Sequence, residues 1–342
     1  MKPNVLLIGG SLNQTTIMHQ IGKHLSDCNV YYTPFYADGF LGLLSKLGLV
    51  HFTILGGRHR RDTEHYLKSQ KLPVDFGGKS RNYDLVITGT DLIIQRNLRG
   101  KRILLVQEGM IEPEGWRYHL MRTLKLPRFI ANTAATGLSN AYHRFCVASN
   151  GYREVFIRKG VNPAKIIVTG IPNFDNAISY THNDFPWHGY ILVATSATRE
   201  TMRYHNRLKF LLKVKEHAQG KPVLFKLHPN ENVANAVREI RLFFPDAPIY
   251  TDGNIHHMIA NCNMLIAQNT SAIFTAVALG KPVICDMDLD TLKKLLPLQN
   301  GGKSAERISE VARQLLATPL HELEKQSIKP YLSPQWKIPP FF

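Results

Sequence analysis

The sequence predicts a two-domain α/β protein in which each domain is built around a parallel β-sheet. Short apolar runs alternate with segments of helical periodicity along the chain, which is the pattern of consecutive βα units. The alternation stops after Thr169, in a stretch punctuated by glycine and proline, and starts again at Tyr190. The chain has 342 residues, enough for two domains of about 150 residues each.

In the first half, apolar runs predict strands and the segments between them predict helices. The predicted strands are 5–8, 29–33, 50–55, 85–88, 103–107, 145–149 and 166–169. The predicted helices are 15–26, 38–47, 62–71, 118–124 and 152–159. We expect this half to form an N-terminal domain over residues 1–170.

The second half repeats the pattern after a linker over residues 171–189. Its predicted strands are 190–195, 222–227, 248–250, 264–267 and 282–285. Its predicted helices are 202–217, 233–243, 255–261, 271–279 and 305–316. We expect a C-terminal domain over 190–328 and an extended tail over 329–342, where four prolines exclude one regular helix.

Composition excludes several classes of protein. With 44% hydrophobic and 20% charged residues, the chain is expected to be globular rather than disordered. No apolar run reaches the roughly 18 residues of a membrane span, and the N-terminus lacks a signal-peptide pattern. The four cysteines are scattered, which predicts buried thiols in a reducing compartment. We therefore expect a cytoplasmic protein.

The net charge of +16 is concentrated in the first half of the chain. Residues 1–170 hold 23 lysines and arginines against 11 acidic residues, a net charge of +12. Such a field favours partners that carry phosphate, although a basic solvated face without a partner is the alternative. No nucleic-acid-binding motif appears, so nucleic acid is not an expected partner.

Polar residues follow two predicted strands of the second half. Lys226 and His228-Pro229 lie at the end of strand 222–227, and Asn269, Thr270 and Ser271 follow strand 264–267. Both loops should emerge at the carboxyl edge of a parallel sheet, where ligands bind. Thr270 or Ser271 would cap the next helix, whose free N–H groups suit a phosphate. Taken singly, these residues could be only a strand end and a helix cap.

These segments resemble a known superfamily. Lys226-Leu227-His228-Pro229, then Asn269-Thr270-Ser271-Ala272-Ile273 and Gly280-Lys281-Pro282-Val283-Ile284, resemble the donor domain of GT-B glycosyltransferases. The nearest resemblance is to the branch of bacterial sialyl- and Kdo-transferases and CDP-glycerol glycerophosphotransferases. It implies a GT-B-like fold, with two Rossmann-like domains whose parallel sheets face an interdomain cleft. It also implies that the His-Pro element and the Thr-Ser pair hold the nucleotide phosphate, and His228 could protonate the departing oxygen.

A carboxylate follows a strand of the first half. Strand 103–107 ends in Gln107-Glu108-Gly109, and the same branch has an acidic-acidic-glycine element whose second acid is the catalytic base. Glu108 and Gly109 match that element, whereas Gln107 departs from it. Glu108 would then deprotonate the acceptor, or attack or assist at the anomeric carbon. The alternative is a loop carboxylate paired with a nearby arginine, with Glu112 and Glu114 as fallback acids.

Two loops of the first half are weaker candidates. Gly10 and Ser11 follow the first strand and could approach a ligand closely, although a plain tight turn is equally consistent with the sequence. Asp91 follows strand 85–88 and could be a second acid at the edge of the cleft.

In the second half, a further loop could contact phosphate. Ser196, Thr198 and Arg199 follow strand 190–195 and offer hydroxyls and a guanidinium group. No metal-binding motif stands out, and we treat Asp286-Met287-Asp288 as coincidental. We therefore expect metal-independent chemistry with no cofactor, the nucleotide-sugar being a substrate.

The expected function is transfer of a sugar from a CMP-linked acidic sugar or a UDP-sugar to a glycan or lipid-linked acceptor, in cell-envelope polysaccharide synthesis. The alternatives are a non-hydrolysing sugar-nucleotide 2-epimerase and a CDP-glycerol-type phosphotransferase. The apolar segment 40–49, with basic runs at 58–61, 96–102 and 117–128, could also place the first domain on an anionic inner membrane face. A core helix beside a solvated basic face explains that pattern equally well.

Overall fold

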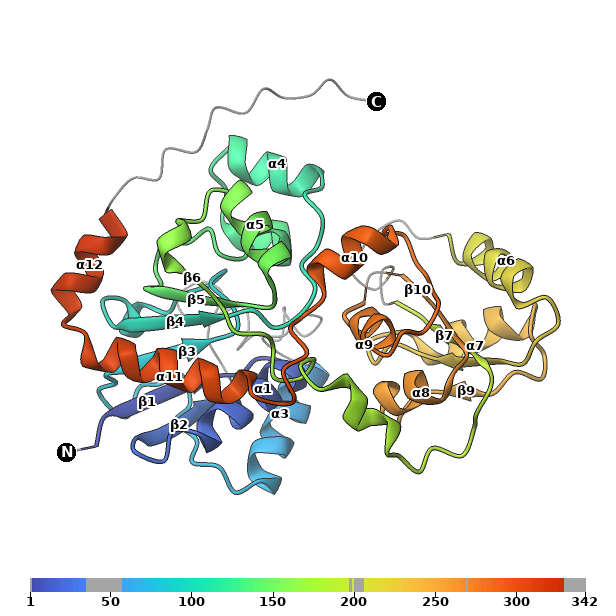
Figure 1. Cartoon of the computed structure of the whole chain (residues 1–342), viewed down its shortest axis with the longest axis horizontal. Helices are drawn as coiled ribbons and strands as arrows, with labels where there is room; N and C mark the ends of the chain where they lie inside the picture. Colours follow the sequence, from blue (N-terminus) through green and yellow to red (C-terminus); the bar gives the residue numbers. More distant parts are fainter. Residues whose placement is uncertain (1, 35–56, 197–198, 200–205, 269, 329–342) are drawn as a thin grey trace. The chain divides into compact units, whose positions relative to one another are not determined.

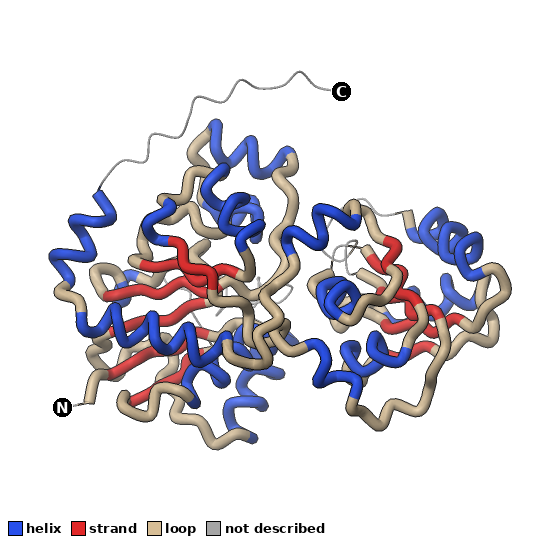
Figure 2. The backbone as a smooth tube through the Cα atoms, in the orientation of Figure 1, coloured by secondary structure: helices blue, strands red, loops and turns tan. Residues whose placement is uncertain are grey.

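The computed structural model of the chain describes residues 2–34, 57–196, 199, 206–268 and 270–328 (Figure 1). It divides into two compact units. Unit 1 comprises Met1–Asp175 and Asn300–Phe342, and unit 2 comprises Asn176–Gln299. Figure 2 shows the strands of each unit gathered among helices. Both units therefore have the layered α/β architecture that the alternating sequence pattern predicts.

Unit 1 contains a six-stranded parallel sheet in the order β2-β1-β3-β4-β5-β6. The strands are β1 (Asn4–Ile8), β2 (Asn29–Thr33), β3 (Leu85–Thr88), β4 (Arg102–Val106), β5 (Arg144–Val147) and β6 (Ile166–Val168). Neighbouring strands are in register, with Val5 opposite Leu85 and Leu85 opposite Arg102. The carboxyl ends of the strands therefore meet at one edge, and the order reverses between β1 and β3.

Helices surround this sheet, and α1 and α5 begin at serine caps. They are α1 (Leu12–Lys23), α3 (Gly57–Ser69), α4 (Trp116–Thr123), α5 (Asn150–Arg158), α11 (Ser304–Ala317) and α12 (Leu320–Ile328). Short 3₁₀ helices are η1 (Arg96–Leu98), η2 (Arg128–Ala135) and η3 (Pro163–Lys165). The Ser11 hydroxyl accepts a hydrogen bond from the Gln14 amide, and Ser149 caps α5 in the same way through the Tyr152 amide.

Helix α11 belongs to unit 1, which differs from the predicted domain division. Its Ser304 amide donates to Asp175 Oδ2 at 2.7 Å, and its Arg313 guanidinium contacts both oxygens of Asp27 at 3.0 and 3.1 Å. The predicted C-terminal domain over 190–328 therefore ends at Gln299 instead. Helical periodicity identifies the buried face of a helix, but it does not say which sheet covers that face.

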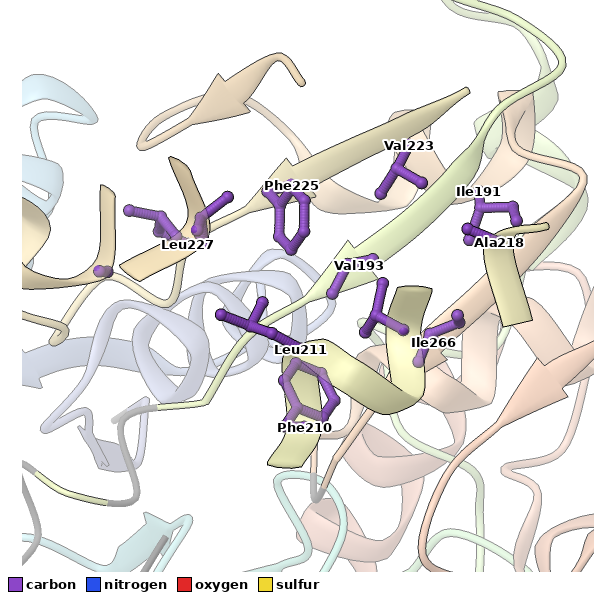
Figure 3. Close-up of a cluster of buried hydrophobic side chains, with 12 residues drawn as sticks. Ile191, Val193, Phe210, Leu211, Ala218, Val223, Phe225, Leu227 and Ile266 are labelled. Atoms are coloured by element: carbon purple, nitrogen blue, oxygen red, sulfur yellow. The ribbon is translucent and has the colours of Figure 1, made fainter. Parts of the chain in front are cut away.

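Unit 2 contains a five-stranded parallel sheet in the order β11-β10-β7-β8-β9. The strands are β7 (Ile191–Ala194), β8 (Val223–Lys226), β9 (Ile249–Tyr250), β10 (Met264–Ala267) and β11 (Val283–Ile284). The helices are α6 (Arg207–Ala218), α7 (Val233–Arg241), α8 (Ile255–Asn261), α9 (Ala272–Ala278) and α10 (Leu289–Leu295), with η4 at Ala177–Thr181. Val193, Leu211 and Phe225 are completely buried in the core between the sheet and α6 (Figure 3).

The predicted class, an α/β protein with parallel sheets, is confirmed. The predictions for residues 38–47, 50–55 and 329–342, including the apolar segment 40–49, lie outside the described residues. Helices α10 and α12 were not predicted from the sequence. Cys28, Cys146 and Cys262 are buried free thiols, whereas Cys285 is half-buried. Within the described ranges, no helix is both long and apolar enough to cross a bilayer.

Candidate functional site

In unit 1, three loops meet at the carboxyl edge of the sheet beside the reversal of strand order. Strand β1 runs into Gly9-Gly10-Ser11, β3 into Gly89 and β4 into Gln107-Glu108. Because β1, β3 and β4 are adjacent and parallel, these loops lie next to one another. A reversal of strand order in an open parallel sheet leaves a crevice at this edge in which ligands bind.

Two glycines in these loops allow α1 to pack directly on the edge. A Cβ atom at Gly9 would lie 2.3 Å from Thr15 Oγ1, and one at Gly89 would lie 3.2 Å from Gln14 Cγ. The buried Gln14 side chain therefore lies on the β3 loop. This close approach of α1 requires a glycine at position 9, whereas the approach of a ligand to Gly10 and Ser11 stays a prediction.

Glu108 lies beside Gln14. Its backbone carbonyl accepts a hydrogen bond from Asn13 Nδ2 at 3.1 Å. Burial raises the pKa of the Glu108 carboxyl to about 7, and a hydrogen bond from the Gln14 side chain partly opposes that rise in pKa. Oε2 is buried and has no hydrogen-bond partner among the described residues. No arginine in the described part of the chain forms an ion pair with the Glu108 carboxylate. The alternative prediction, a loop carboxylate paired with a nearby arginine, is therefore not what the structure contains.

The hydrogen bonds of Gln107 explain why the first position of the acidic-acidic-glycine element is an amide in this chain. Its Nε2 donates to Gly109 O at 2.8 Å, while its Oε1 accepts from the Ala148 amide at 2.9 Å. Only an amide can donate and accept in these two places, because an ionised carboxylate has no donor. Gln107 thus connects the loops after β4 and β5 and holds the backbone on either side of Glu108.

Asp91 is a correction to the sequence analysis. Its side chain is completely buried, with Oδ1 accepting from the Gly137 amide and Oδ2 from the Ser139 amide, both at 2.9 Å. These bonds occupy both oxygens and fix the loop that follows η2. The structure therefore gives Asp91 a structural role. Of the fallback acids, Glu112 is half-buried and Glu114 is exposed.

Asn13, Gln14 and Asn173 are residues that the sequence analysis missed. Asn173 follows β6, and its Nδ2 donates to Asn13 Oδ1 at 2.8 Å and to Thr16 Oγ1 at 2.9 Å. The segment after β6 is thereby fastened to the helix that carries Gln14. The spacing of Ser11 and Gln14 matches a capping box, which could have drawn attention to Gln14. In the structure its side chain lies beside Glu108.

In unit 2, the order β10-β7-β8 brings three predicted loops to one edge of the sheet. Ser196 follows β7 in the middle, His228 follows β8, and Gln268 follows β10. The Ser196 hydroxyl lies 3.5 Å from Gln268 Oε1, so the loops after β7 and β10 touch. The strand order also reverses between β7 and β10, which makes this the expected ligand crevice of the second sheet. Thr198 and Asn269 lie outside the described residues.

His228 is held in a defined orientation and is half-buried. Its backbone amide contacts Thr195 Oγ1 at 3.1 Å and Glu231 Oε2 at 2.9 Å. Its Nδ1 accepts a hydrogen bond from the Asn230 amide at 3.1 Å. Because Nδ1 is an acceptor, the hydrogen of the neutral imidazole is on Nε2, which can donate to an anionic oxygen. Pro229 is exposed in the turn between them.

A buried ion pair, which the sequence analysis also missed, supports this loop. Glu231 bonds to Arg207 at the start of α6, and both side chains are at most 2% exposed. The same carboxylate accepts from the Thr195 hydroxyl and from the His228 amide. One carboxylate therefore joins the ends of β7 and β8 to α6. The sequence signal was an acid three residues after His228.

A cavity of about 320 Å³ opens beside the same edge of unit 2. Its walls come from α6 and from the ends of β10 and β11, and include Lys209, Lys213, Gln268 and Asp286. Gln268 contributes to both the cavity and the loop edge. A volume of this size lies at the lower end of the range for small-molecule sites.

Comparison with known proteins identifies the fold. No family model and no curated protein sequence matches the chain. UDP-GlcNAc 2-epimerase from Neisseria meningitidis, solved with UDP-GlcNAc, has a TM-score of 0.56 and 13% identity over 91% of this chain and 100% of that chain. The 2-epimerase from Rickettsia bellii has a TM-score of 0.55 and 10% identity, over 95% and 99%. Anabaena Alr3699/HepE, solved with UDP, has a TM-score of 0.51 and 13% identity, over 97% and 96%.

The chain has a GT-B-type fold. This confirms the fold that the sequence resemblance implied. The narrower resemblance to sialyl- and Kdo-transferases gains no support, because none of these structures is described as one of them. With identities of 10–13%, the similarity is one of fold, and the residue roles come from this chain's own geometry.

Within this GT-B fold, two predicted phosphate contacts need correction. The Lys226 ammonium group is buried and donates to Leu227 O at 3.1 Å and to Thr251 O at 2.8 Å. The Arg199 guanidinium makes a bidentate contact with Glu239 in α7, at 2.7 and 2.8 Å. Both cations thus bind groups of the protein. At the start of α9, Thr270 Oγ1 accepts from the Ala272 amide at 3.3 Å, and Ser271 is half-buried with helical backbone angles.

No group of three or more histidine, cysteine or acidic residues in the described ranges is arranged to hold a metal ion. His228, Ser196 and Thr270 lie on the loops that follow β8, β7 and β10 at this edge.

Proposed function

We propose that the chain is a glycosyltransferase that uses a nucleotide-activated sugar as donor, with Glu108 as its catalytic base. The observation that carries this proposal is the state of the Glu108 carboxyl. It is half-buried, lies at the ligand-binding edge of the first sheet and has its pKa raised to about 7 by burial. A general base works best when its pKa lies near the operating pH. Glu108 is therefore suited to exchange a proton at neutral pH.

The donor is assigned to unit 2. The crevice between β7 and β10 supports this assignment, together with the oriented His228 imidazole and the cavity that Gln268 lines. The similar structures from N. meningitidis and Anabaena were solved with UDP-GlcNAc and with UDP, which favours a nucleotide-sugar for this chain too. A CMP-linked acidic sugar and a UDP-sugar are both compatible with the site.

In the proposed reaction, the ionised Glu108 carboxylate takes the proton of an acceptor hydroxyl. The hydroxyl oxygen then bonds to the anomeric carbon, and the bond from that carbon to the donor phosphate breaks. The phosphate oxygen leaves with the electron pair, and the Nε2–H of His228 stabilises it by hydrogen bonding. The acceptor is proposed to be a glycan or a lipid-linked glycan. Neither a metal ion nor a cofactor is part of the proposal.

A sugar-nucleotide 2-epimerase is the second candidate, because two of the similar structures are 2-epimerases. Elimination and re-addition of the nucleotide require several acids around the sugar. Asp91, which the sequence analysis offered as a second acid at the edge of the cleft, has both oxygens bound to backbone amides. Incubation with UDP-GlcNAc without acceptor, followed by NMR, separates the candidates, because only an epimerase would release UDP-ManNAc.

Replacing His228 should weaken nucleotide binding. His228→Ala removes the Nε2–H donor, and a hydrogen bond to a charged group contributes about 1.5–3 kcal/mol. We expect the dissociation constant for the preferred nucleotide among CMP, CDP and UDP to rise roughly ten- to hundred-fold. Isothermal titration measures it, with His182→Ala as an exposed control in the same unit. Equal affinity of wild type and His228→Ala would remove His228 from the donor site.

The pH dependence of turnover should depend on Gln14. Activity should rise with pH through about 7 as Glu108 ionises. Gln14→Leu removes the hydrogen bond that lowers the pKa of Glu108, so the rising limb should move upward by roughly one pH unit. A profile of kcat/KM against pH tests this. A loss of activity that is equal at every pH would indicate only a structural role for Gln14.

A further inference from the structure

Helix α4 carries apolar side chains on two different faces. Tyr118 and Met121 are buried in a small cluster with the alanines of η2. Trp116, Leu120 and Leu124 follow one another at intervals of four residues, with Leu124 immediately after the last helical turn. Residues four apart lie on the same face of a helix. These three residues form a second apolar face, which we call the α4 stripe.

The α4 stripe faces solvent. Trp116 is 71% exposed, Leu124 60% and Leu120 39%. The helix lies at the periphery of unit 1 in Figure 1. A stripe of this kind usually marks a binding surface, because apolar side chains that stay exposed to water do not stabilise the folded state.

Most of the charges around the stripe are positive, and the acidic exception is Glu114, just before α4. Arg117 and Lys125 lie on or next to α4 beside the stripe, and after Glu114 the sequence contains no acidic residue before Glu154. The Arg117 guanidinium lies 5.5 Å from the centroid of the Trp116 ring. Lys125 is exposed, whereas Arg122 lies on the opposite side of α4, where its Nη1 donates to Tyr118 Oη at 3.3 Å. The stripe and its cations therefore form one amphipathic, positively charged surface.

We propose that the α4 stripe docks unit 1 on an anionic membrane surface. Trp116, Leu120 and Leu124 enter the interface between headgroups and acyl chains, and the neighbouring cations contact the lipid phosphates. An apolar face with tryptophan, flanked by lysine and arginine, is the composition of helices that lie in the plane of a membrane. A surface on which cations predominate complements anionic lipids, whereas a protein partner would have to present a matching acidic rim.

This inference goes beyond the proposed function and does not depend on it. The sequence analysis expected only basic charge from residues 117–128 and placed the apolar contact at 40–49, outside the described residues. The α4 stripe places the apolar contact on a described helix of unit 1. Vesicle binding needs neither donor nor acceptor, so its failure and a failure of the transferase assignment are distinguishable.

The test uses the full chain with vesicles of phosphatidylcholine alone and of phosphatidylcholine mixed with phosphatidylglycerol. We expect sedimentation with the anionic vesicles only, accompanied by a blue shift of tryptophan emission. Trp116→Ser/Leu120→Ser/Leu124→Ser should abolish both. Arg117→Gln/Lys125→Gln should weaken binding about 25-fold at low salt, since each cation near the surface contributes roughly five-fold.

A matched control comes from unit 2. Leu208 and Leu212 of α6 are 50% and 55% exposed and lie beside lysines, so Leu208→Ser/Leu212→Ser removes a comparable apolar surface elsewhere. We expect wild-type vesicle binding from this variant and unchanged thermal unfolding from all three. Equal binding to neutral vesicles, or retention of binding by the stripe variant, would overturn the proposal. So would a dimer in sedimentation velocity that the stripe variant dissociates.

Discussion

Replacing Glu108 with glutamine should lower turnover by about 10²- to 10⁴-fold, the usual contribution of a general base. The amide has the shape of the carboxyl but cannot take a proton from an acceptor. Nucleotide affinity should stay within about two-fold of wild type, because the donor is assigned to unit 2. Initial rates with saturating donor, together with nucleotide titrations, measure the two effects separately.

Two controls make this result specific. Glu112→Gln and Glu114→Gln change the acids that follow in the same segment, and we expect turnover close to wild type from both. Because burial raises the pKa of Glu108 above its unfolded value, the carboxyl favours folding at low pH, and this contribution is lost as the pH rises through about 7. Glu108→Gln should therefore be no less stable than wild type at pH 8. Wild-type turnover in Glu108→Gln would refute the base assignment.

Arg207→Met should destabilise unit 2 by about 3–5 kcal/mol. The substitution leaves the Glu231 carboxylate buried beneath the His228 loop without its guanidinium partner. An uncompensated buried charge costs far more than the ion pair itself contributes. Urea denaturation followed by circular dichroism reports the loss, and nucleotide binding should weaken in parallel because Glu231 orients the His228 backbone.

The ion pair can be tested as a unit. Arg207→Met/Glu231→Gln removes both charges and should recover most of the lost stability, giving a coupling energy of more than about 1 kcal/mol in a double-mutant cycle. The exposed pair of Arg60 and Glu64 serves as a control, since Arg60→Met should change stability by less than about 1 kcal/mol. An Arg207→Met variant as stable as wild type would show that the buried pair does not support the loop.

The positions of the strands, and therefore of the loops, were accessible from the sequence. Apolar runs such as 103–107 and 222–227 place Glu108 and His228 at strand ends, and parallel strands bring their ends to one edge. The α/β class and the parallel sheets followed from the same alternation. The roles of Glu108 and His228 remain predictions, because strand position says nothing of a proton or a phosphate.

The partners of individual polar groups were not accessible from the sequence. Asp91 bonds to amides 46 and 48 residues away, and Arg199 bonds to Glu239, 40 residues away. A strand-end acid or cation looks the same in sequence whether it faces a ligand or a neighbouring loop. Helix α11 shows the same limitation at a larger scale, because its apolar periodicity is compatible with either sheet.

The return of the chain to unit 1 at Asn300 makes unit 2 an insertion within a discontinuous unit 1. On the side of unit 1, the Gly301 amide donates to Asp175 O at 3.1 Å. On the side of unit 2, the Ala177 amide donates to Gln299 Oε1 at 3.0 Å. The two connections therefore run close together. A short peptide joining Asp175 to Gly301 would close unit 1 with its last two helices in place, whereas cutting the gene after Gln299 would remove them. When the two units are studied separately, unit 1 should be expressed in the form in which a short peptide joins Asp175 to Gly301.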